Sequence, residues 1–476
     1  MSTDPAADGG GGPRPGRSRF RRVNGVVLTV LAGAAIALGA ANATQGPRLN
    51  SAEINTRALV ARAEQRLVLH ANQSLTDIDA SQVTVTPSVP VDVSVDAAAI
   101  TIRFQEILDY DTDYSVSVAD VTGAFTNAAR RFDYDFVTPS VDVYTLLRNT
   151  TTEAGVDAPD RVLRNSPTGA ESTVVFEAPR IQEYAASETV LMTVLQEQDD
   201  TTALVLTSLS DGVSTTVGTP AGGPLHDLRM SDELVGFRMG GELDAVTSTR
   251  PAPLFVLDLT DASGVPVQVV GLDGAPLPVL DYLFVPGTTA LVAQAEDTQL
   301  YLVDPVTGTP PTPLGQHAEL RGFVPGTTDL VVADPLSGSR IDLADGSVRP
   351  LDLPPAEADP VLTAGKIVVL GENTYLQQFD RFDYSEAQTS ISSVLRLVDP
   401  TGTRPAYTPA SESSRIRDFC MSPNGQLAAI EVVPAGSPVD DYDRLPAFTD
   451  ITTYFVDVAT GATRRSVSGF LPSWCR

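Results

Sequence analysis

Carboxylates are the side chains from which this sequence could most readily build an active site. Asp227, Asp281 and Asp418 each precede an apolar residue and stand at similar places in three apolar segments. Two carboxylates roughly 5–10 Å apart beside an open pocket can cleave a glycosidic bond. The alternative role is hydrogen bonding in turns and at strand edges. The sequence selects no pair among the three, so we predict that none of them is catalytic.

Histidines and glycine-rich motifs add no catalytic candidate. His70, His226 and His317 lack a histidine at metal-ligand spacing, and we expect them to be surface or strand residues. The chain contains neither a Gly-x-Ser-x-Gly elbow nor a Walker or Rossmann glycine pattern. We therefore predict a protein that is not an enzyme and that holds no cofactor.

One acidic segment has the alternating spacing of a calcium ligand set. Asp109, Asp111 and Asp113 supply the oxygen ligands that Ca²⁺ prefers. The segment lacks the glycine and the glutamate of a helix-loop-helix calcium loop. A solvated turn is the other reading, and we predict no metal site, with calcium as the one alternative.

The elements that must position these residues are repeated strands from residue 140 onward. Two nearly identical stretches begin at Phe284 and Phe323, 39 residues apart, and both read Phe-Val-Pro-Gly-Thr-Thr. A second pattern, an apolar strand followed by Asp and a turn that ends in Gly, occurs seven times. Asp caps such a turn with its carboxylate and Gly supplies the positive φ. The seven copies begin at Val162, Leu204, Phe255, Tyr301, Arg340, Leu397 and Tyr454.

Each copy belongs to a unit of four strands, here called A to D. In the last unit these strands cover residues 415–422, 426–433, 451–457 and 463–467. Four-stranded units of about 40–50 residues are the blades of a β-propeller. The turn Met421-Ser-Pro-Asn-Gly-Gln-Leu-Ala resembles the Ser-Pro-Asp-Gly turn of TolB-like propellers, with Asn424 in the place of Asp. The seven repeated units predict a seven-bladed β-propeller over residues 140–476, the part of the chain that the resemblance covers.

The first blade lacks its inner strand, and the end of the chain can supply it. Residues 140–178 hold three strands, and the segment 468–476 aligns with strand A, so that Cys475 corresponds to Cys420. We predict that this C-terminal strand closes the ring. The two cysteines then lie at equivalent positions of adjacent blades, and we predict a Cys420–Cys475 disulfide. Two buried free thiols are the alternative.

Long insertions between strands B and C mark a candidate binding surface. They cover residues 149–160, 240–253, 372–393 and 434–449, and the loops of this type share one face of a propeller. Exposed aromatic residues flanked by charge are typical of binding surfaces. The alternative is that these loops pack on the ring. The candidate binding residues are Tyr375, Phe379, Asp380, Phe382, Asp383, Tyr384, Asp440, Asp441, Tyr442, Asp443 and Phe448.

Residues 47–139 predict a separate β-sandwich. Short alternating strands recur about every 10 residues. Val83-Thr-Val-Thr-Pro, Ile102-Arg-Phe, Tyr114-Ser-Val-Ser-Val and Tyr134-Asp-Phe-Val-Thr-Pro resemble the bacterial Ig-like domain of S-layer proteins (SbsA type). Such domains act mainly as spacers or adhesive modules.

The N-terminus predicts a membrane anchor. Residues 25–41 carry no charge and follow an arginine-rich segment, so residues 23–43 read as a transmembrane signal-anchor. Residues 1–22 would form a disordered cytoplasmic tail, and the bulk of the chain would be extracytoplasmic at the cell membrane. The small-x-small pattern Ala41-Asn42-Ala43 leaves open a cleaved signal peptide.

The charge of the chain excludes one class of partner. A net charge of -28 repels phosphate polymers, so we expect no nucleic acid. The resulting prediction is an all-β protein with an N-terminal transmembrane helix, an Ig-like β-sandwich and a seven-bladed β-propeller. Its predicted function is non-enzymatic binding or scaffolding in the cell envelope, with a protein or a cell-wall polymer as ligand. A propeller enzyme of glycosidase or lyase type, or an envelope sensor with a partner, is the alternative.

Overall fold

The computed structural model is built almost entirely of β-strands. It describes residues 23–34, 46–148, 158–169, 171–197, 201–220, 223–240, 251–356, 361–384, 390–442 and 444–475. The chain divides into two compact units. Unit 1 comprises Met1–Asn55, Gln65–Gln105 and Asp113–Phe136, and unit 2 comprises Thr56–Glu64, Glu106–Thr112 and Val137–Arg476.

The predicted transmembrane helix over residues 23–43 is wrong. The described part of this segment is a helix over residues 23–34, and no described helix is long and apolar enough to cross a membrane. Twelve residues rise only about 18 Å in an α-helix, whereas the hydrocarbon core of a bilayer is about 30 Å thick. The predicted single-pass location at the cell membrane, which rested on this anchor, is withdrawn with it. The tail at 1–22 and residues 35–43 lie outside the described residues.

Unit 1 is formed by two antiparallel sheets. In the first, strand order is β1 (Leu49–Ile54), β2 (Arg66–Ala71), β5 (Ala99–Phe104), β4 (Val91–Asp96). In the second it is β3 (Val83–Thr86), β6 (Asp113–Gly123), β7 (Thr126–Val137). Alternation buries one side of each sheet, as Ile100 and Ile102 of β5 and Val116 and Val118 of β6 show. The sequence period of two is therefore the cause of this two-sheet core.

The described residues of unit 2 form six sheets that follow one another along the chain. They make up seven blades of a β-propeller, because the one eight-stranded sheet contains both blade three and blade four. Six blades have four strands, and the first has three plus a C-terminal segment. The strands are, for blade one, β8 (Val143–Leu147), β9 (Asp160–Asn165) and β10 (Ser172–Ala178); blade two, β11 (Ile181–Ala186), β12 (Val190–Gln196), β13 (Thr202–Ser208) and β14 (Ser214–Val217); blade three, β15 (Leu225–Met230), β16 (Leu234–Met239), β17 (Ala252–Asp258) and β18 (Val267–Gln268); blade four, β19 (Pro278–Phe284), β20 (Leu291–Ala295), β21 (Gln299–Val303) and β22 (Thr312–Gln316); blade five, β23 (Glu319–Phe323), β24 (Asp329–Asp334), β25 (Ser337–Asp342) and β26 (Val348–Pro350); blade six, β27 (Thr363–Gly371), β28 (Thr374–Asp383), β29 (Ser390–Asp399) and β30 (Gly402–Tyr407); and blade seven, β31 (Arg415–Met421), β32 (Leu427–Val433), β33 (Thr452–Asp457) and β34 (Thr463–Ser468).

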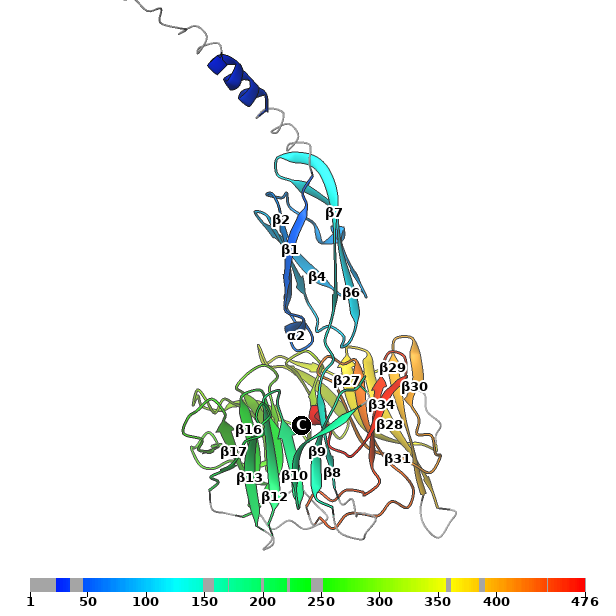
Figure 1. The fold of residues 1–476 in the computed structure, drawn as a ribbon. Coiled ribbons are helices and arrows are strands. Elements are labelled where there is room, and N and C mark those ends of the chain that lie inside the picture. The colour runs from blue at the N-terminus through cyan, green and yellow to red at the C-terminus, as the bar shows by residue number, and fades with distance from the viewer. Residues whose placement is uncertain are drawn as a thin grey trace, which may run out of the picture. The chain divides into compact units, whose positions relative to one another are not determined.

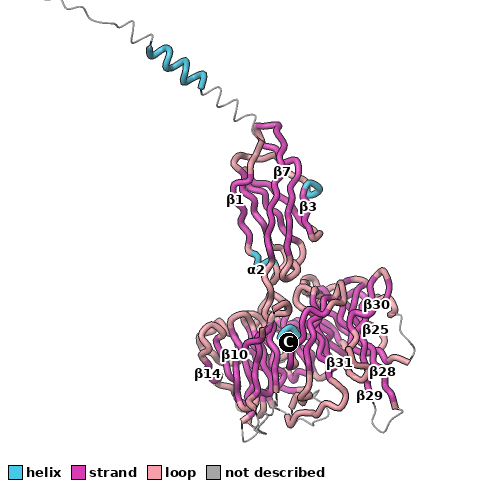
Figure 2. Tube along the Cα trace, turned by 45° about the vertical axis from the view of Figure 1, so that its right-hand side comes forward, coloured by secondary structure: helices cyan, strands magenta, loops and turns pink. Residues whose placement is uncertain are grey.

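The first strands of the blades form the inside of a ring. Successive inner strands β11, β15, β19, β23 and β27 contact one another in chain order, β31 contacts β29 of blade six, and the short 3-10 helix η2 (Ser473–Cys475) contacts both β31 and β8. Figures 1 and 2 show these blades and the C-terminus beside the strands of blade one. One departure from separate blades occurs where the start of β17 pairs with the start of β19, at Ala252↔Val279.

Residues 469–475 close this ring, but not as the predicted C-terminal strand, because they hold only one β-bridge residue and the 3-10 helix η2. Phe470 forms a β-bridge with Leu146 of β8, with both backbone hydrogen bonds at 2.8 and 2.9 Å. Cys420 of β31 and Cys475 of η2 are joined by a disulfide, and their Cα atoms lie 5.3 Å apart. The predicted disulfide is confirmed. It fastens the closing segment to blade seven.

The repeated Asp-to-Gly pattern forms the turn between strands C and D. In blade four, Asp304 Oδ1 accepts hydrogen bonds from the backbone N–H groups of Val306 and Thr307, and Gly308 has φ +64°. Asp457 and Gly461 form the corresponding turn of blade seven. The conformation needs a carboxylate at the strand end and a residue that tolerates positive φ. These aspartates therefore stabilise the C–D turns.

Topology puts the loops on two opposite faces of the propeller. Strand A starts at one face, so the D–A and B–C loops share that face, here called the B–C face, while the A–B and C–D turns share the other.

Residues 106–112 of unit 2 contact the A–B turn of blade seven. Tyr110 N–H donates to Gln426 Oε1 at 2.8 Å, and Asn424 Nδ2 donates to Leu108 O at 3.0 Å. Tyr110 also stacks on Trp474, with ring centroids 6.5 Å apart.

Candidate functional site

The blade-six candidates are divided between the core and the surface. The insertion at 372–393 is a long hairpin of β28 and β29, of which residues 385–389 lie outside the described residues. Tyr375 and Phe379 are buried, and the Tyr375 hydroxyl donates to Pro354 O at 2.6 Å. The Asp380 carboxylate accepts hydrogen bonds from Ser393 and from Gln378. These three side chains pack and pair inside the blade.

The tip of the same hairpin is exposed. Phe382 is 39 % exposed and Tyr384 is 74 % exposed. Their rings stack on each other, with centroids 6.3 Å apart and planes 14° apart. Asp383, between them on β28, is also exposed and has an interaction partner. The two aromatic rings, here called the aromatic tip, are exposed aromatic candidates among the described residues of the blade-six insertion.

The blade-seven candidates are held by arginines. Asp440 pairs with Arg148 at 3.0 Å, and both side chains are almost fully buried. The guanidinium of Arg148 lies 3.9 Å from the centroid of the Tyr442 ring, and the Tyr442 hydroxyl donates to Asp160. Burial raises the pKa of the Tyr442 phenol, and the hydrogen bond to the Asp160 carboxylate raises it further. This cluster is structural packing between blades one and seven.

The other blade-seven candidates are also engaged. Asp441 is exposed but pairs with Arg180 at 2.9 Å. Phe448 packs against the core beneath Arg415, whose guanidinium lies 4.7 Å from the ring centroid. Asp443 lies outside the described residues, as do most of the insertions of blade one (149–157) and blade three (241–250).

The inner-strand carboxylates are each neutralised by a cation. Arg229 contacts Asp227 at 3.1 Å and Asp281 at 2.7 Å. Burial lowers the pKa of the Arg229 guanidinium, but these two carboxylates raise it by more. Asp418 pairs with Lys366 at 2.6 Å. Asp281 and Asp418 therefore form ion pairs between neighbouring inner strands, whereas Asp227 is paired within its own blade, with Arg229 of β15 and Arg238 of β16.

These ion pairs are placed by β-bulges. Each inner strand from β11 to β31 shifts register near its start, as between Ile416 and Asp418 in β31. A bulge re-aims one side chain and increases the local twist. Beside these bulges, Asp281 and Asp418 each meet a basic side chain of the preceding inner strand, whereas Asp227 meets Arg229 of its own strand.

The histidines and the Asp109 segment contribute no metal site among the described residues. No group of three or more His, Cys, Asp or Glu side chains there could hold a metal ion. His226 is buried, and burial together with the charge of Arg238 lowers its pKa. His317 lies 3.0 Å from Asp334, and His70 lies 3.4 Å from Glu53. The calcium alternative is left without support.

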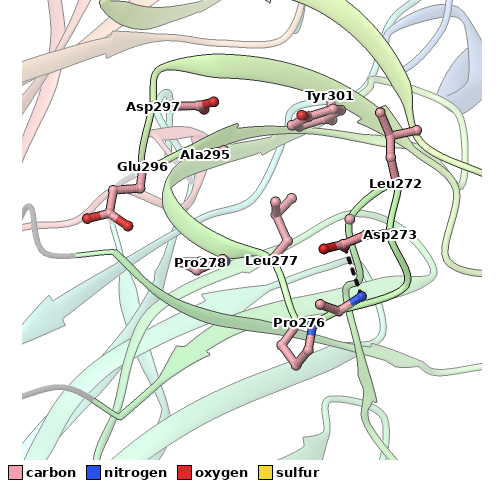
Figure 3. A pocket seen from close by; sticks show the side chains of 11 residues that line it. Leu272, Asp273, Pro276, Leu277, Pro278, Ala295, Glu296, Asp297 and Tyr301 are labelled. Carbon is pink, nitrogen blue, oxygen red and sulfur yellow. Dashed lines mark hydrogen bonds between the residues drawn. The ribbon is translucent and has the colours of Figure 1, made fainter.

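A pocket that the sequence analysis missed lies on the B–C face of blade four. It has a volume of about 510 Å³ and forms between two chain segments, the loop from β18 to β19 and the B–C turn from β20 to β21. Figure 3 shows its side chains, with Leu277 between Asp273 on one side and Asp297 and Tyr301 on the other. The lining residues are Gly271, Leu272, Asp273, Ala275, Pro276, Leu277, Pro278, Ala295, Glu296, Asp297 and Tyr301.

The wall of the pocket is a tight hairpin. Val270 and Pro276 form a β-bridge, and Gly271 N–H donates to Ala275 O at 2.8 Å. Asp273 Oδ1 accepts the N–H of Ala275 at 3.0 Å, which fixes the carboxylate beside the turn. The signal for this hairpin was present in the sequence as Asp273-Gly274, a dipeptide favoured in turns.

Charge distinguishes the pocket from the inner strands. Asp273, Glu296 and Asp297 are exposed, and none of them takes part in an ion pair with a described residue. Beside them stand the apolar side chains of Leu272, which is 59 % exposed, and of Leu277, which is buried. Negative charge and apolar surface are thus combined at one accessible place.

Comparisons with known proteins give distant structural neighbours and no family. No protein-family model matches the chain, and no curated protein matches it in sequence. Among solved structures, the propeller domain of the Trilobed protease from Pyrococcus furiosus is 8 % identical, with a TM-score of 0.41, over 72 % of this chain and 90 % of that chain. A candidate TolB protein from Agrobacterium tumefaciens is 13 % identical, with a TM-score of 0.30, over 62 % and 99 %. A prolyl endopeptidase is 10 % identical, with a TM-score of 0.42, over 75 % and 48 %. The assignment as a β-propeller rests on the strand order and ring closure described above.

Proposed function

We propose that this protein is a non-enzymatic binding protein whose propeller holds a partner protein on its B–C face. The observation that carries the proposal is the apolar side chains on that face. Over blades three to six they include Leu272 (59 % exposed), Leu336 (100 % exposed) and the aromatic tip. Clustered exposed apolar and aromatic residues mark protein-interaction surfaces, because exposing them without a partner is unfavourable.

The opposite face is a poorer candidate. The exposed large apolar side chains of its C–D turns are valines, Val213, Val265 and Val306. Part of its A–B side is occupied within unit 2 by residues 106–112. Among the described residues, a partner therefore finds larger exposed apolar side chains on the B–C face.

The enzyme alternative has less support. It requires carboxylates free to exchange protons, and Asp227, Asp281 and Asp418 are each paired with a cation. An ion pair favours the charged form of a carboxylate, which opposes a role as general acid. The sensor alternative relied on the membrane anchor and is dropped.

The Ig-like identity of unit 1 is part of the same proposal. Two antiparallel sheets of four and three strands, with an aromatic core that includes the stacked Tyr114 and Phe136 rings at 5.5 Å, support it. In this proposal unit 1 is a spacer or an adhesive module, and the propeller is the binding unit.

Site-specific photo-crosslinking tests the proposal. The full chain carries Tyr384→benzoylphenylalanine at the aromatic tip, or Val213→benzoylphenylalanine on a C–D turn of the opposite face as the matched control. Val213 is 58 % exposed, so both probes meet solvent. We expect a defined set of covalent adducts with proteins of the source cell at residue 384 and none of that set at residue 213. The same adducts at both positions would refute the proposal.

A further inference from the structure

We infer that the blade-four pocket binds a basic side chain, Lys or Arg, from an apolar-basic peptide segment of a partner. This goes beyond the proposed function, which assigns no ligand chemistry to the pocket. The two ideas share Leu272 but are tested at different residues, since the aromatic tip belongs to blade six and the pocket to blades three and four.

The first step is charge. The inner-strand aspartates already have their cations, whereas Asp273, Glu296 and Asp297 have no ion-pair partner among the described residues. Three carboxylates around one hollow give a negative potential that attracts a cation and repels an anion. The charge of the whole chain, -28, has the same sign and strengthens the long-range attraction.

The second step is shape and apolar surface. Lys and Arg carry a long aliphatic stem that prefers apolar contacts while its head stays near polar groups. Leu272, Leu277 and Pro276 offer such contacts, and the Tyr301 ring offers a face on which a cation can stack. A volume of about 510 Å³ is within the range of ordinary ligand sites and exceeds the needs of a bare metal ion.

The third step is preorganisation. Asp273 is held by the Ala275 N–H, and Asp297 Oδ1 accepts the N–H of Gln299 at 3.1 Å. The hairpin that carries Asp273 is closed by a second backbone bond, from Leu277 N–H to Val269 O at 3.1 Å. Because two of the carboxylates are fixed before binding, the entropic cost of ordering their side chains around a cation is small.

The surroundings favour a peptide over a small free cation. Val267 and Val270, 57 % and 40 % exposed, precede Leu272 in the chain and extend the apolar surface beyond the pocket. A single amine would leave this surface exposed to water. A segment that alternates basic and apolar residues covers it while it fills the pocket.

Fluorescence anisotropy of a labelled peptide with the full chain tests the inference. The probe is Arg-Leu-Arg-Leu-Arg, and its control is the same peptide with the neutral isostere citrulline in place of arginine. We expect the citrulline peptide to bind roughly tenfold more weakly. The variant Asp273→Asn/Glu296→Gln/Asp297→Asn should lose roughly tenfold in affinity for the arginine peptide. Leu272→Ser should lose about threefold.

A matched variant separates the pocket from general surface charge. Asp211→Asn/Asp261→Asn/Asp345→Asn removes the same number of charges from C–D turns on the opposite face. Hydrogen bonds from Ser208 and Val213 lower the pKa of Asp211, and hydrogen bonds from Ser263 and Ser347 lower the pKa of Asp261 and Asp345, so these carboxylates are ionised at neutral pH. We expect less than about a twofold change in affinity, because salt screens distant exposed charges.

Three results would overturn the inference: equal losses in both triple variants, equal binding of the two peptides, or no binding of the arginine peptide. Phe382→Ala/Tyr384→Ala should keep its affinity for the peptide. Failure of the crosslinks at residue 384 would therefore refute the proposed function alone, and failure of the peptide test would refute this inference alone. The circular dichroism spectrum of each variant should match that of the unmodified protein, which shows that the variants are folded.

Discussion

Blades six and seven carry insertions of similar composition, and they use them differently. In blade seven the aspartate and the tyrosine are drawn into the core by Arg148, which is itself buried. In blade six the strands simply extend, and the aromatic tip stays in solvent. Composition alone did not separate these two outcomes. Among the described residues, arginines from outside blade seven contact the Tyr442 ring of its insertion, whereas no such contact is seen on the two rings of the aromatic tip.

The comparison shows which contacts pack an insertion of aromatic and acidic residues into the fold. Asp440 receives Arg148, and the Tyr442 ring receives the guanidiniums of both Arg148 and Arg180, at 3.9 and 4.2 Å. In blade six, Arg396 stacks on Phe379, 5.5 Å from the ring centroid, deeper in the sheet than the tip. In both blades the aromatic ring that packs is the one contacted by an arginine, and in blade six the rings nearer the end of the hairpin stay exposed.

The largest effect is expected from removing the cation of blade seven. Arg148→Ala should lower the free energy of unfolding by about 3–5 kcal/mol, because the Asp440 carboxylate is left buried without its counter-charge. Urea unfolding followed by the fluorescence of Trp474, the one tryptophan of the chain, measures this in the closing segment.

Two controls sharpen that measurement. Arg404→Ala removes an arginine from the exposed pair with Asp399, and we expect a loss of under about 1 kcal/mol. Arg148→Ala/Asp440→Ala removes both buried charges and should recover part of the stability. A small effect of Arg148→Ala would mean that the blade-seven loop does not depend on this pair, and the contrast with blade six would fail.

An intermediate effect is expected within blade six itself. Phe379→Ala should cost about 3 kcal/mol, since the ring is 4 % exposed and its loss leaves a cavity in the sheet. The same urea titration measures it. Tyr375→Phe is the milder companion, which removes only the hydrogen bond to Pro354 O at 2.6 Å and should cost about 1 kcal/mol. A change at Phe379 no larger than that at Tyr375 would contradict its placement in the core.

Much of the propeller was predictable because its signals are local. The turn that runs from Asp304 to Gly308 needs a capping carboxylate and a positive φ, and both requirements can be read from a few adjacent residues. The disulfide followed from the equivalence of Cys420 and Cys475 in the repeat. Because the blades repeat, this long-range contact could be predicted by aligning two short segments of the sequence.

The remainder was not predictable because the partners are distant in sequence. Arg148 and Asp440 are 292 residues apart, and no pattern links them. The pocket joins a hairpin after the two-residue strand β18 to a turn of the next blade, and neither segment is unusual alone. The membrane prediction failed for a different reason, since it took the absence of charge in residues 25–41 as sufficient, whereas the described helix covers only residues 23–34.

The smallest effect on stability is expected at the aromatic tip, and this is the most informative test of the comparison. Phe382→Ala/Tyr384→Ala should change the free energy of unfolding by under about 0.5 kcal/mol, because the two rings are exposed and contact chiefly each other. Urea unfolding of the double variant and of Phe379→Ala compares the two changes in the free energy of unfolding within one hairpin. If the tip costs as much as Phe379, its rings are part of the fold, and the proposal that they face a partner loses its basis. If it costs nothing while the crosslinks placed at a neighbouring tip residue, Asp383, disappear from the double variant, the rings serve recognition and not folding.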